Sequence, residues 1–199
     1  TDRFTGRVTV LPADAEPFAD TAEDAWYASY LTEARRSGIV NGVGDNCFVP
    51  DRETSRAEFV TMLSRLNAFF DGSEVIDGDA EYADVPDDAW FAPYVRWADA
   101  SGLVQGSEGM FMPNDTITME QMLLILYRYA GEMGLDTPAR AETDPWADQP
   151  ASDYAVEAVS WAAAVGLADW AADTGAAPRQ PMNRAQVTVM LVEFLEFCR

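Results

Sequence analysis

The hydrophobic pattern of the chain predicts helices that come in pairs. Apolar residues recur at spacings of three and four in residues 26–34 and again in residues 90–98, which is typical of a helix with one buried face. Longer apolar stripes follow in residues 59–66, 122–129 and 187–194. Gly38, Gly102 and Gly166 mark the ends of the shorter helices, because glycine readily adopts the left-handed conformation that closes a last turn.

The helix pairs lie in three similar segments. Residues 18–42, 82–106 and 146–170 align without a gap, and further columns follow at Pro50, Pro113 and Pro178. One pair of short helices cannot bury its apolar face alone, so three pairs are expected to pack on one another. We therefore predict an all-α fold with a pseudo-threefold arrangement of helix–loop–helix units. Its predicted parts are an N-terminal arm (1–17), a first segment (18–72), a second segment with its linker (73–135) and a third segment with its linker (136–199).

Composition and charge narrow the class of protein. The chain has 199 residues, 48% of them hydrophobic, which suffices for a folded core. The 13 basic residues are all arginine and the formal net charge is −21, so no basic face is available for a phosphate backbone, and we expect no nucleic-acid partner. No apolar run is long enough to span a membrane. The first residues do not resemble a signal peptide, so an exported protein would already have lost its signal.

The residue types present argue against catalysis and metal binding. The chain has no histidine and two cysteines, Cys47 and Cys198, for which a disulfide is the less favoured alternative to free thiols. Asp45 and Asn46 lack the ligand spacing of an EF-hand loop. Nothing selects two facing carboxylates of the kind that a glycosidase needs. We expect no catalytic residue, no metal and no cofactor.

Residues 54–59, TSRAEF, are predicted to start a helix with a capping box. The hydroxyl of Ser55 would accept from a backbone amide of the first turn, and the carboxylate of Glu58 would reach back. The second and third segments have different residues that can form the same hydrogen bonds, namely Thr118 with Gln121 and Asn183 with Gln186.

The capping box does not explain Arg56, which lies between its two members. A cation in the first turn faces the positive end of the helix dipole, where an acid is preferred. Two explanations stay open: Arg56 pairs with Glu53 or Asp51, or it binds an anion together with the free amides of the helix start. Arg184 has the same position in the third segment, and Met119 replaces it in the second.

Together these residues resemble the S-layer homology (SLH) domain. The resemblance rests on an aromatic-Ala-Asp start, a following Trp, Gly-Ile-Val-Asn-Gly, Phe-x-Pro and a Ser-Arg-Ala-Glu helix start, and it is strongest over GIVNGVGDNCFVPDRETSRAEF. It implies three tandem SLH domains, the second and third partly degenerate, with grooves between neighbours. It also implies an extracellular protein without enzymatic activity at the bacterial cell wall or S-layer. Such a protein is attached noncovalently through pyruvylated secondary cell-wall polysaccharide, an acidic partner.

The same resemblance implies a set of glycan-binding residues. Arg56 and Arg184 would bind the ketal carboxylate, and Gly42 and Gly106 would let the ligand approach the backbone. The residues that would contact sugar or shape the grooves are Asp20, Asp84, Asp148, Trp26 and Trp90. Simpler explanations stay open, because aromatic residues at helical spacing are usually in the core and aspartates before a helix are often turn or cap residues.

Departures from the family pattern suggest unequal grooves. Met119 replaces an arginine in the second segment, whereas Trp170 and Ala176 replace a glycine and a phenylalanine in the third. Taken segment by segment, this predicts one intact groove, one doubtful groove and one that is disabled or altered. Arg56→Ala is expected to weaken binding more than Arg184→Ala. The alternative function is a degenerate unit that serves as a structural or protein-protein interaction module at the cell surface.

Overall fold

The protein is described by a computed structural model, which covers residues 17–72, 78–135, 137, 140–142 and 145–199. Over these residues the regular elements are helices and no strand occurs, which confirms the all-α prediction. The predicted arm, apart from residue 17, lies outside the described residues. The elements are α1 (Ala28–Arg36), α2 (Arg56–Asp71), α3 (Ala92–Ala100), α4 (Met119–Glu132), the 3-10 helix η1 (Asp153–Ala155), α5 (Val156–Ala164), α6 (Trp170–Thr174) and α7 (Arg184–Phe197).

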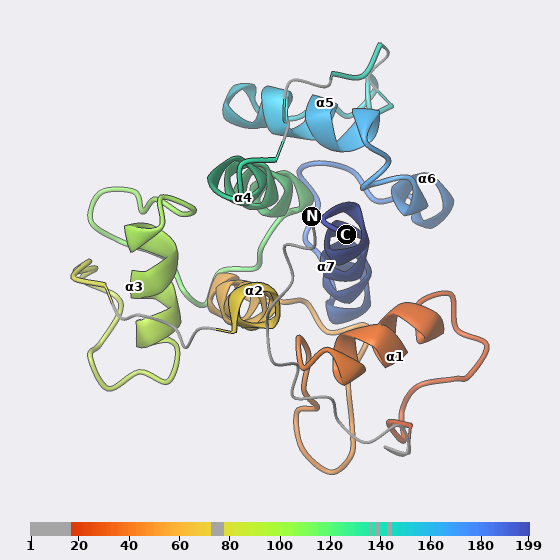
Figure 1. Cartoon of the computed structure of the whole chain (residues 1–199), viewed down its shortest axis with the longest axis horizontal. Coiled ribbons are helices and arrows are strands. Elements are labelled where there is room, and N and C mark those ends of the chain that lie inside the picture. The colour runs from red at the N-terminus through yellow and green to blue at the C-terminus, as the bar shows by residue number, and fades with distance from the viewer. Residues whose placement is uncertain (1–16, 73–77, 136, 138–139, 143–144) are drawn as a thin grey trace.

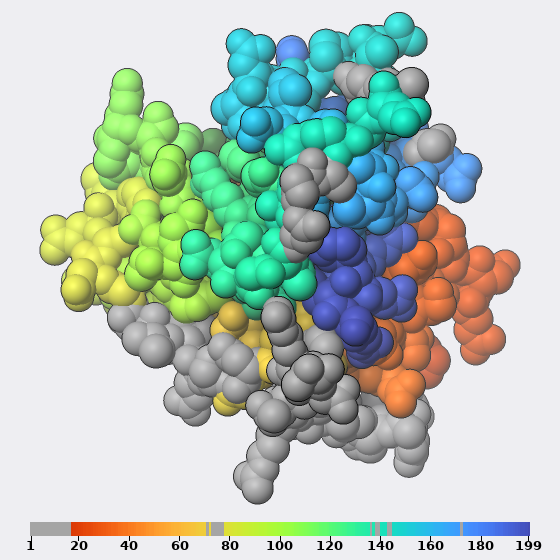
Figure 2. Space-filling view, turned by 45° about the horizontal axis from the view of Figure 1, so that its top comes forward, coloured from red at the N-terminus to blue at the C-terminus, as the bar shows by residue number. Residues whose placement is uncertain are grey.

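Three long helices form the centre of the molecule and three shorter ones surround them. Figure 1 shows α2, α4 and α7 together in the middle, with α1, α3 and α5 outside. The main packing partner of each outer helix belongs to another segment: α1 packs on α7, α3 on α2 and α5 on α4. In Figure 2 the dark blue end of α7 accordingly lies between orange residues of the first segment and green residues of the second. Neighbouring segments are therefore interlocked in a cyclic order.

The predicted apolar stripes of the long helices are buried. The stripe residues are Phe59, Met62, Leu63 and Leu66, then Met122, Ile125, Leu126 and Tyr129, then Val187, Met190, Leu191 and Phe194, and none is more than 5% exposed. Tyr129 connects the three central helices, because its ring stacks on Phe194 with centroids 5.7 Å apart and its hydroxyl donates to Asn67 Oδ1 at 2.8 Å. Burial of each large apolar side chain stabilises the fold by about 1.5–3 kcal/mol.

The short helices end where expected but do not begin where expected. Gly38, Gly102 and Gly166 have φ of 71°, 68° and 78°, which confirms the left-handed ends. The core interpretation of Trp26 and Trp90 is wrong, since these side chains are 46% and 61% exposed and precede α1 and α3. The predicted helices therefore began two residues too early. Tyr27 and Phe91, which follow these tryptophans, do pack against the core. Helix α6 was not predicted, and Cys47 and Cys198 are free thiols.

A closed ring of hydrogen bonds joins the three segments just before the central helices. The amide of Thr54 donates to Met182 O at 2.9 Å, the amide of Met182 to Ile117 O at 3.0 Å, and the amide of Ile117 to Thr54 O at 2.9 Å. Each central helix then receives two carbonyls from another segment. In α2, the amides of Arg56 and Ala57 donate to Asp115 O at 2.9 Å and to Pro113 O at 3.0 Å.

The same exchange occurs at α4 and α7, where the column of prolines again supplies a carbonyl. Pro178 O accepts from Glu120 at 2.7 Å, and Pro50 O accepts from Ala185 at 3.0 Å. The three expected capping boxes all form, and each satisfies the amide of the third helical position. At α2 the first three amides are therefore all bonded within the protein. The explanation in which free amides at this helix start bind an anion is wrong.

Candidate functional site

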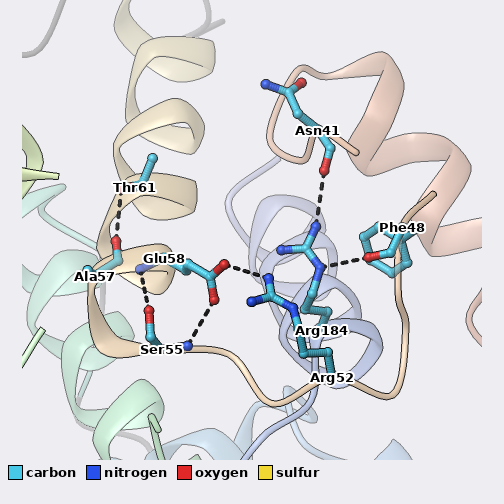
Figure 3. A network of polar contacts seen from close by, with 8 residues as sticks. All are labelled: Asn41, Phe48, Arg52, Ser55, Ala57, Glu58, Thr61 and Arg184. Carbon is cyan, nitrogen blue, oxygen red and sulfur yellow. Dashed lines mark hydrogen bonds and ion pairs between the residues drawn. The ribbon is translucent and has the colours of Figure 1, made fainter. Parts of the chain in front are cut away.

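Arg56 and Arg184 lie flat against an aromatic ring from another segment. The Cζ atom of Arg56 is 4.8 Å from the centroid of Phe111, and that of Arg184 is 4.8 Å from the centroid of Phe48. Each Nε donates to the carbonyl of the same phenylalanine, at 3.0 Å for Arg56 and 2.8 Å for Arg184. Arg184 Nη2 also donates to Asn41 O at 3.0 Å (Figure 3). The ring and the carbonyl together fix the plane of each guanidinium.

Neither arginine has a carboxylate partner among the described residues, since no ion pair of Arg56 or Arg184 occurs there. The open alternative in which Arg56 pairs with Glu53 or Asp51 is therefore wrong. Glu53 instead accepts from Thr116 Oγ1 at 2.8 Å. Arg56 and Arg184 are 9% and 5% exposed, and burial lowers the pKa of both guanidinium groups. Asp115 near Arg56 and Glu58 near Arg184 oppose this shift from a distance, without an ion pair. A desolvated guanidinium that makes no ion pair is suited to a carboxylate or phosphate ligand.

Asp20 and Asp84 shape the loops that carry the two phenylalanines. Asp20 accepts from the amides of Phe48 at 2.8 Å and Val49 at 2.7 Å, and these hydrogen bonds lower its pKa although burial alone would raise it. Asp84 accepts in the same way from Phe111 at 2.8 Å and Met112 at 2.7 Å. Val49 and Met112 have φ of 56° and 60°, a conformation that is costly for side chains of this size. These two aspartates are thus loop-shaping residues rather than simple turn residues.

Asp148 is not part of such an arrangement in the described structure. It is exposed, and no hydrogen bond to a backbone amide is found for it among the described residues. The loop of the third segment is held differently, because the indole Nε1 of Trp146 donates to Ala176 O at 3.0 Å.

Gly42 and Gly106 are required by the protein's own packing. A Cβ on Gly42 would lie 2.8 Å from the Phe18 ring and 2.9 Å from Cys47 O. A Cβ on Gly106 would lie 2.3 Å from the Tyr82 ring and 2.5 Å from Met110 O. The loops therefore fold onto the aromatic residue that begins each segment, which accounts for glycine here without a ligand.

The first groove, defined by Arg184, Arg52, Glu58, Trp90 and the loop of Asp20, contains two arginines. Arg52 Nη2 lies 2.5 Å from Glu58 Oε1, while the other carboxylate oxygen accepts from the amide of Ser55 at 3.1 Å. In Figure 3 the guanidinium groups of Arg52 and Arg184 lie side by side, and the charge of Arg52 contributes to the lowered pKa of Arg184 after the larger effect of burial. Arg52, Glu58 and the exposed Trp90 also border an open hollow of about 310 Å³.

The interface that corresponds by residue position to the first groove is formed by Arg56, the loop of Asp84, Tyr82 and Tyr154, and is called the second groove here. Burial and the hydrogen bond to Glu120 raise the pKa of Tyr154 to about 12, whereas the nearby charge of Arg56 lowers it. Burial and Asp99 likewise raise the pKa of Tyr82 to about 12, and Arg56 opposes this shift too. Arg56 thus lies within electrostatic range of tyrosines from the second and the third segment.

The third interface lacks the arginine, the phenylalanine and the open loop together. Met119 is fully buried at the start of α4, Ala176 stands where the other loops have phenylalanine, and Trp170 replaces glycine. Trp170 stacks on Trp26 with centroids 5.9 Å apart. Each groove combines residues from two or three segments. The substitutions at positions 119, 170 and 176, which lie in two segments, therefore meet at one interface. The expectation was one intact groove, one doubtful groove and one disabled or altered groove. The structure instead has two interfaces with arginine, phenylalanine and aspartate, and one altered interface with apolar residues in place of the arginine and the phenylalanine.

The sequence analysis missed Arg52, Tyr154 and Glu120 as groove residues. Tyr154 belongs to the column of Trp26 and Trp90, and Glu120 replaces the alanine found at positions 57 and 185, so both differences were visible as departures. Arg52 carried no signal, because its neighbour Arg184 is distant in the chain.

Residues 17–60 and 81–123 match the S-layer homology domain. The chain is also 34% identical over 128 residues to a cell surface protein of Thermoanaerobacter kivui, covering 63% of this chain and 17% of the relative. An exoglucanase of Acetivibrio thermocellus is 27% identical over 194 residues, 97% of this chain and 17% of the relative. A surface layer protein of Brevibacillus choshinensis is 27% identical over 132 residues, 62% of this chain and 12% of the relative.

The chain therefore spans less than a fifth of the length of these relatives. The two S-layer homology matches cover most of the first segment and the middle of the second, and they include Asp20, Arg56, Asp84 and Met119. Among the described residues, no helix is both long and apolar enough to cross a membrane.

Proposed function

We propose that this chain anchors an exported protein noncovalently to the bacterial cell wall by binding pyruvylated secondary cell-wall polysaccharide in its first and second grooves. The observation that carries the proposal is the pair of buried, flat guanidinium groups, Arg184 and Arg56, neither paired with a carboxylate among the described residues. A ketal of pyruvate presents one carboxylate next to an apolar sugar face. A guanidinium offers that carboxylate a bidentate contact, and an exposed aromatic ring suits the sugar face.

The proposal extends to the third segment and to the compartment. We propose that residues 136–199 are a third, degenerate S-layer homology domain, with the domain boundaries expected from the sequence and an N-terminal arm before them. The third capping box, Arg184 and the closed ring of hydrogen bonds support this extension. The protein would be extracellular, with an acidic glycan as partner, without nucleic-acid partners, and without catalytic activity of its own. Relatives named as surface layer and cell surface proteins support the cell-wall assignment.

We propose a role for each groove residue, and the geometry supports these roles. Arg184 and Arg56 would bind the ketal carboxylate, with Arg52 as a second cation in the first groove. Asp20 and Asp84 would hold the loops, and Trp90 and Tyr154 would stack on the sugar. Asp148 and Trp26 are not proposed as glycan contacts, because Asp148 has no loop to hold and Trp26 stacks on Trp170.

A second candidate function rests on the filled interface. A degenerate unit that acts as a structural or protein-protein interaction module is favoured by this interface, where Met119 stands in place of an arginine, Ala176 in place of a phenylalanine, and Trp26 stacks on Trp170. This candidate predicts that binding to the wall does not depend on either arginine.

The two candidates are separated by cosedimentation with bacterial wall sacculi before and after chemical removal of the secondary polymer. The test variants are Arg184→Met and Arg56→Met, since methionine is the residue that the chain itself has at position 119. A defined probe, a pyruvate ketal of a hexosamine, is titrated by calorimetry beside its methyl ester, which lacks the carboxylate charge. We expect the parent protein to bind intact sacculi and the free-acid ketal. This binding should be lost when the secondary polymer is removed, when the ketal is esterified, and when Arg184→Met and Arg56→Met are combined. If all variants sedimented equally with the sacculi, the glycan-anchor proposal would fail and the interaction-module function would be favoured.

A further inference from the structure

Glu120 is a buried acid at a position where the other central helices have alanine. It is 4% exposed at the second position of α4, and Ala57 and Ala185 are its counterparts in α2 and α7. Its Oε2 accepts from the amide of Ser152 at 2.8 Å. Its Oε1 accepts from Ser152 Oγ at 2.8 Å and from the hydroxyl of Tyr154 at 2.7 Å. Both oxygens of this carboxylate are thus committed to the third segment.

The third of these hydrogen bonds reaches a wall of the second groove. The side chain of Tyr154 is 55% exposed, so the ring is accessible while its hydroxyl is held by Glu120. Arg56 lies within electrostatic range of this hydroxyl. The corresponding wall of the first groove is Trp90, which is 61% exposed and for which no side-chain hydrogen bond is found among the described residues. The two grooves therefore differ in the size of their aromatic wall and in its fixation.

We propose, on the basis of the proposed function, that Glu120 is a positioning residue that fixes Tyr154 and thereby sets the sugar preference of the second groove. A phenol held by a buried carboxylate presents one ring face in one orientation, so less conformational freedom is lost when a sugar stacks on it. The second groove then takes a small sugar with its carboxylate opposite Arg56. The first groove, with a larger indole that no hydrogen bond fixes among the described residues, takes a bulkier sugar.

The test isolates one groove at a time in the full chain. Arg184→Met leaves the second groove as the acidic-ligand site, and Arg56→Met leaves the first. Glu120→Ala is placed in each background, and the pyruvate ketal of a hexosamine is titrated by calorimetry. We expect Glu120→Ala to lower affinity about fivefold in the Arg184→Met background, because the freed Tyr154 ring must then be ordered when the sugar binds. In the Arg56→Met background we expect a loss of less than about twofold.

Two further variants exclude a merely structural effect. Glu120→Gln keeps an acceptor for the Tyr154 hydroxyl and is expected to restore most of the affinity. Tyr154→Phe keeps the ring and removes the hydroxyl, so it should reproduce Glu120→Ala and add nothing to it in the double variant. Thermal unfolding of each variant shows that the comparison is made on folded protein.

The outcomes distinguish this inference from the function on which it rests. A similar loss in both backgrounds, or no loss with Arg184→Met, would overturn the role of Glu120 while leaving the anchor intact. If Arg184→Met alone abolished all binding, the second groove would not be a site, and the inference would fail although the first groove still binds.

Discussion

Glu193 makes the stability of this protein depend on pH in an unusual direction. It lies on α7 at the position that corresponds to Arg65 in α2 and Arg128 in α4, and it faces α1. The hydroxyl of Tyr30 donates to Oε1 at 3.2 Å, whereas Oε2 is buried without a hydrogen-bond partner among the described residues. Burial raises the pKa of Glu193 to about 7, and the nearby Asp169 and Glu196 add to this effect, against the hydrogen bond from Tyr30.

The direction of the effect follows from proton linkage. The pKa of Glu193 is about 7 in the folded protein and close to 4.5 in the unfolded chain, so the folded state binds the proton more tightly. The protonated form therefore stabilises the fold fully below pH 4.5, and this contribution is lost as pH rises toward 7. The pKa difference corresponds to ~3 kcal/mol at most. Because the side chain is partly exposed and solvent screens it, we expect ~1–2 kcal/mol.

The perturbation is Glu193→Gln, which keeps the shape and removes the charge. Urea unfolding at pH 5, 6, 7 and 8 should show the parent losing ~1–2 kcal/mol of unfolding free energy over this range and the variant losing less. At pH 8 the variant should melt about 2–4 °C higher for each kcal/mol gained. Glu132→Gln on α4 is the matched control, since Glu132 is exposed. An identical pH slope in the parent and Glu193→Gln would refute the reasoning.

Three further predictions concern the grooves. Calorimetry should show that Arg184→Met weakens binding of the pyruvate ketal more than Arg56→Met, because Arg184 acts beside Arg52. This order reverses the ranking expected from the sequence, and a larger effect of Arg56→Met would contradict it. Asp20→Asn should lower the affinity for the pyruvate ketal about tenfold by calorimetry, since one acceptor of the loop amides is lost. Asp148→Asn should leave the affinity unchanged, and equal effects of the two variants would show that the loop contacts are irrelevant. Binding of the acidic polymer should strengthen modestly between 10 and 150 mM salt, because screening reduces the repulsion by the −21 charge; steady weakening with salt in sedimentation would argue for dominant ion pairing.

Features set by neighbouring residues could be predicted from the sequence. The capping box of Ser55 and Glu58 and the left-handed Gly38 involve residues within one turn, so spacing alone determines them. The apolar stripe of α2 was equally clear, because one face of sixteen helical residues must be buried. The same reasoning gave a wrong prediction for Trp26, which was expected on the buried face of a helix. A periodic pattern does not show where a helix begins, and Trp26 lies before α1.

The candidate site depends on contacts between segments, which the sequence does not show. Arg56 was assigned an anion from its conflict with the helix dipole, but its ring partner Phe111 belongs to the second segment. The condition of the grooves was misjudged for the same reason. Met119 and Ala176 looked like separate defects in two segments, although the structure brings them to a single interface.

The closed ring of Thr54, Ile117 and Met182 limits how such a protein can change in length. In an open stack of repeats, a unit can be added or removed at an end, because the exposed end resembles the one before it. Here each segment completes the helix start of another, and the last completes the first. A fragment with two segments would leave carbonyl acceptors and helix amides unmatched on both sides of the gap, and a fourth segment would find no place. In evolution and in protein engineering, the three segments should therefore be transferred to another protein together, as one unit.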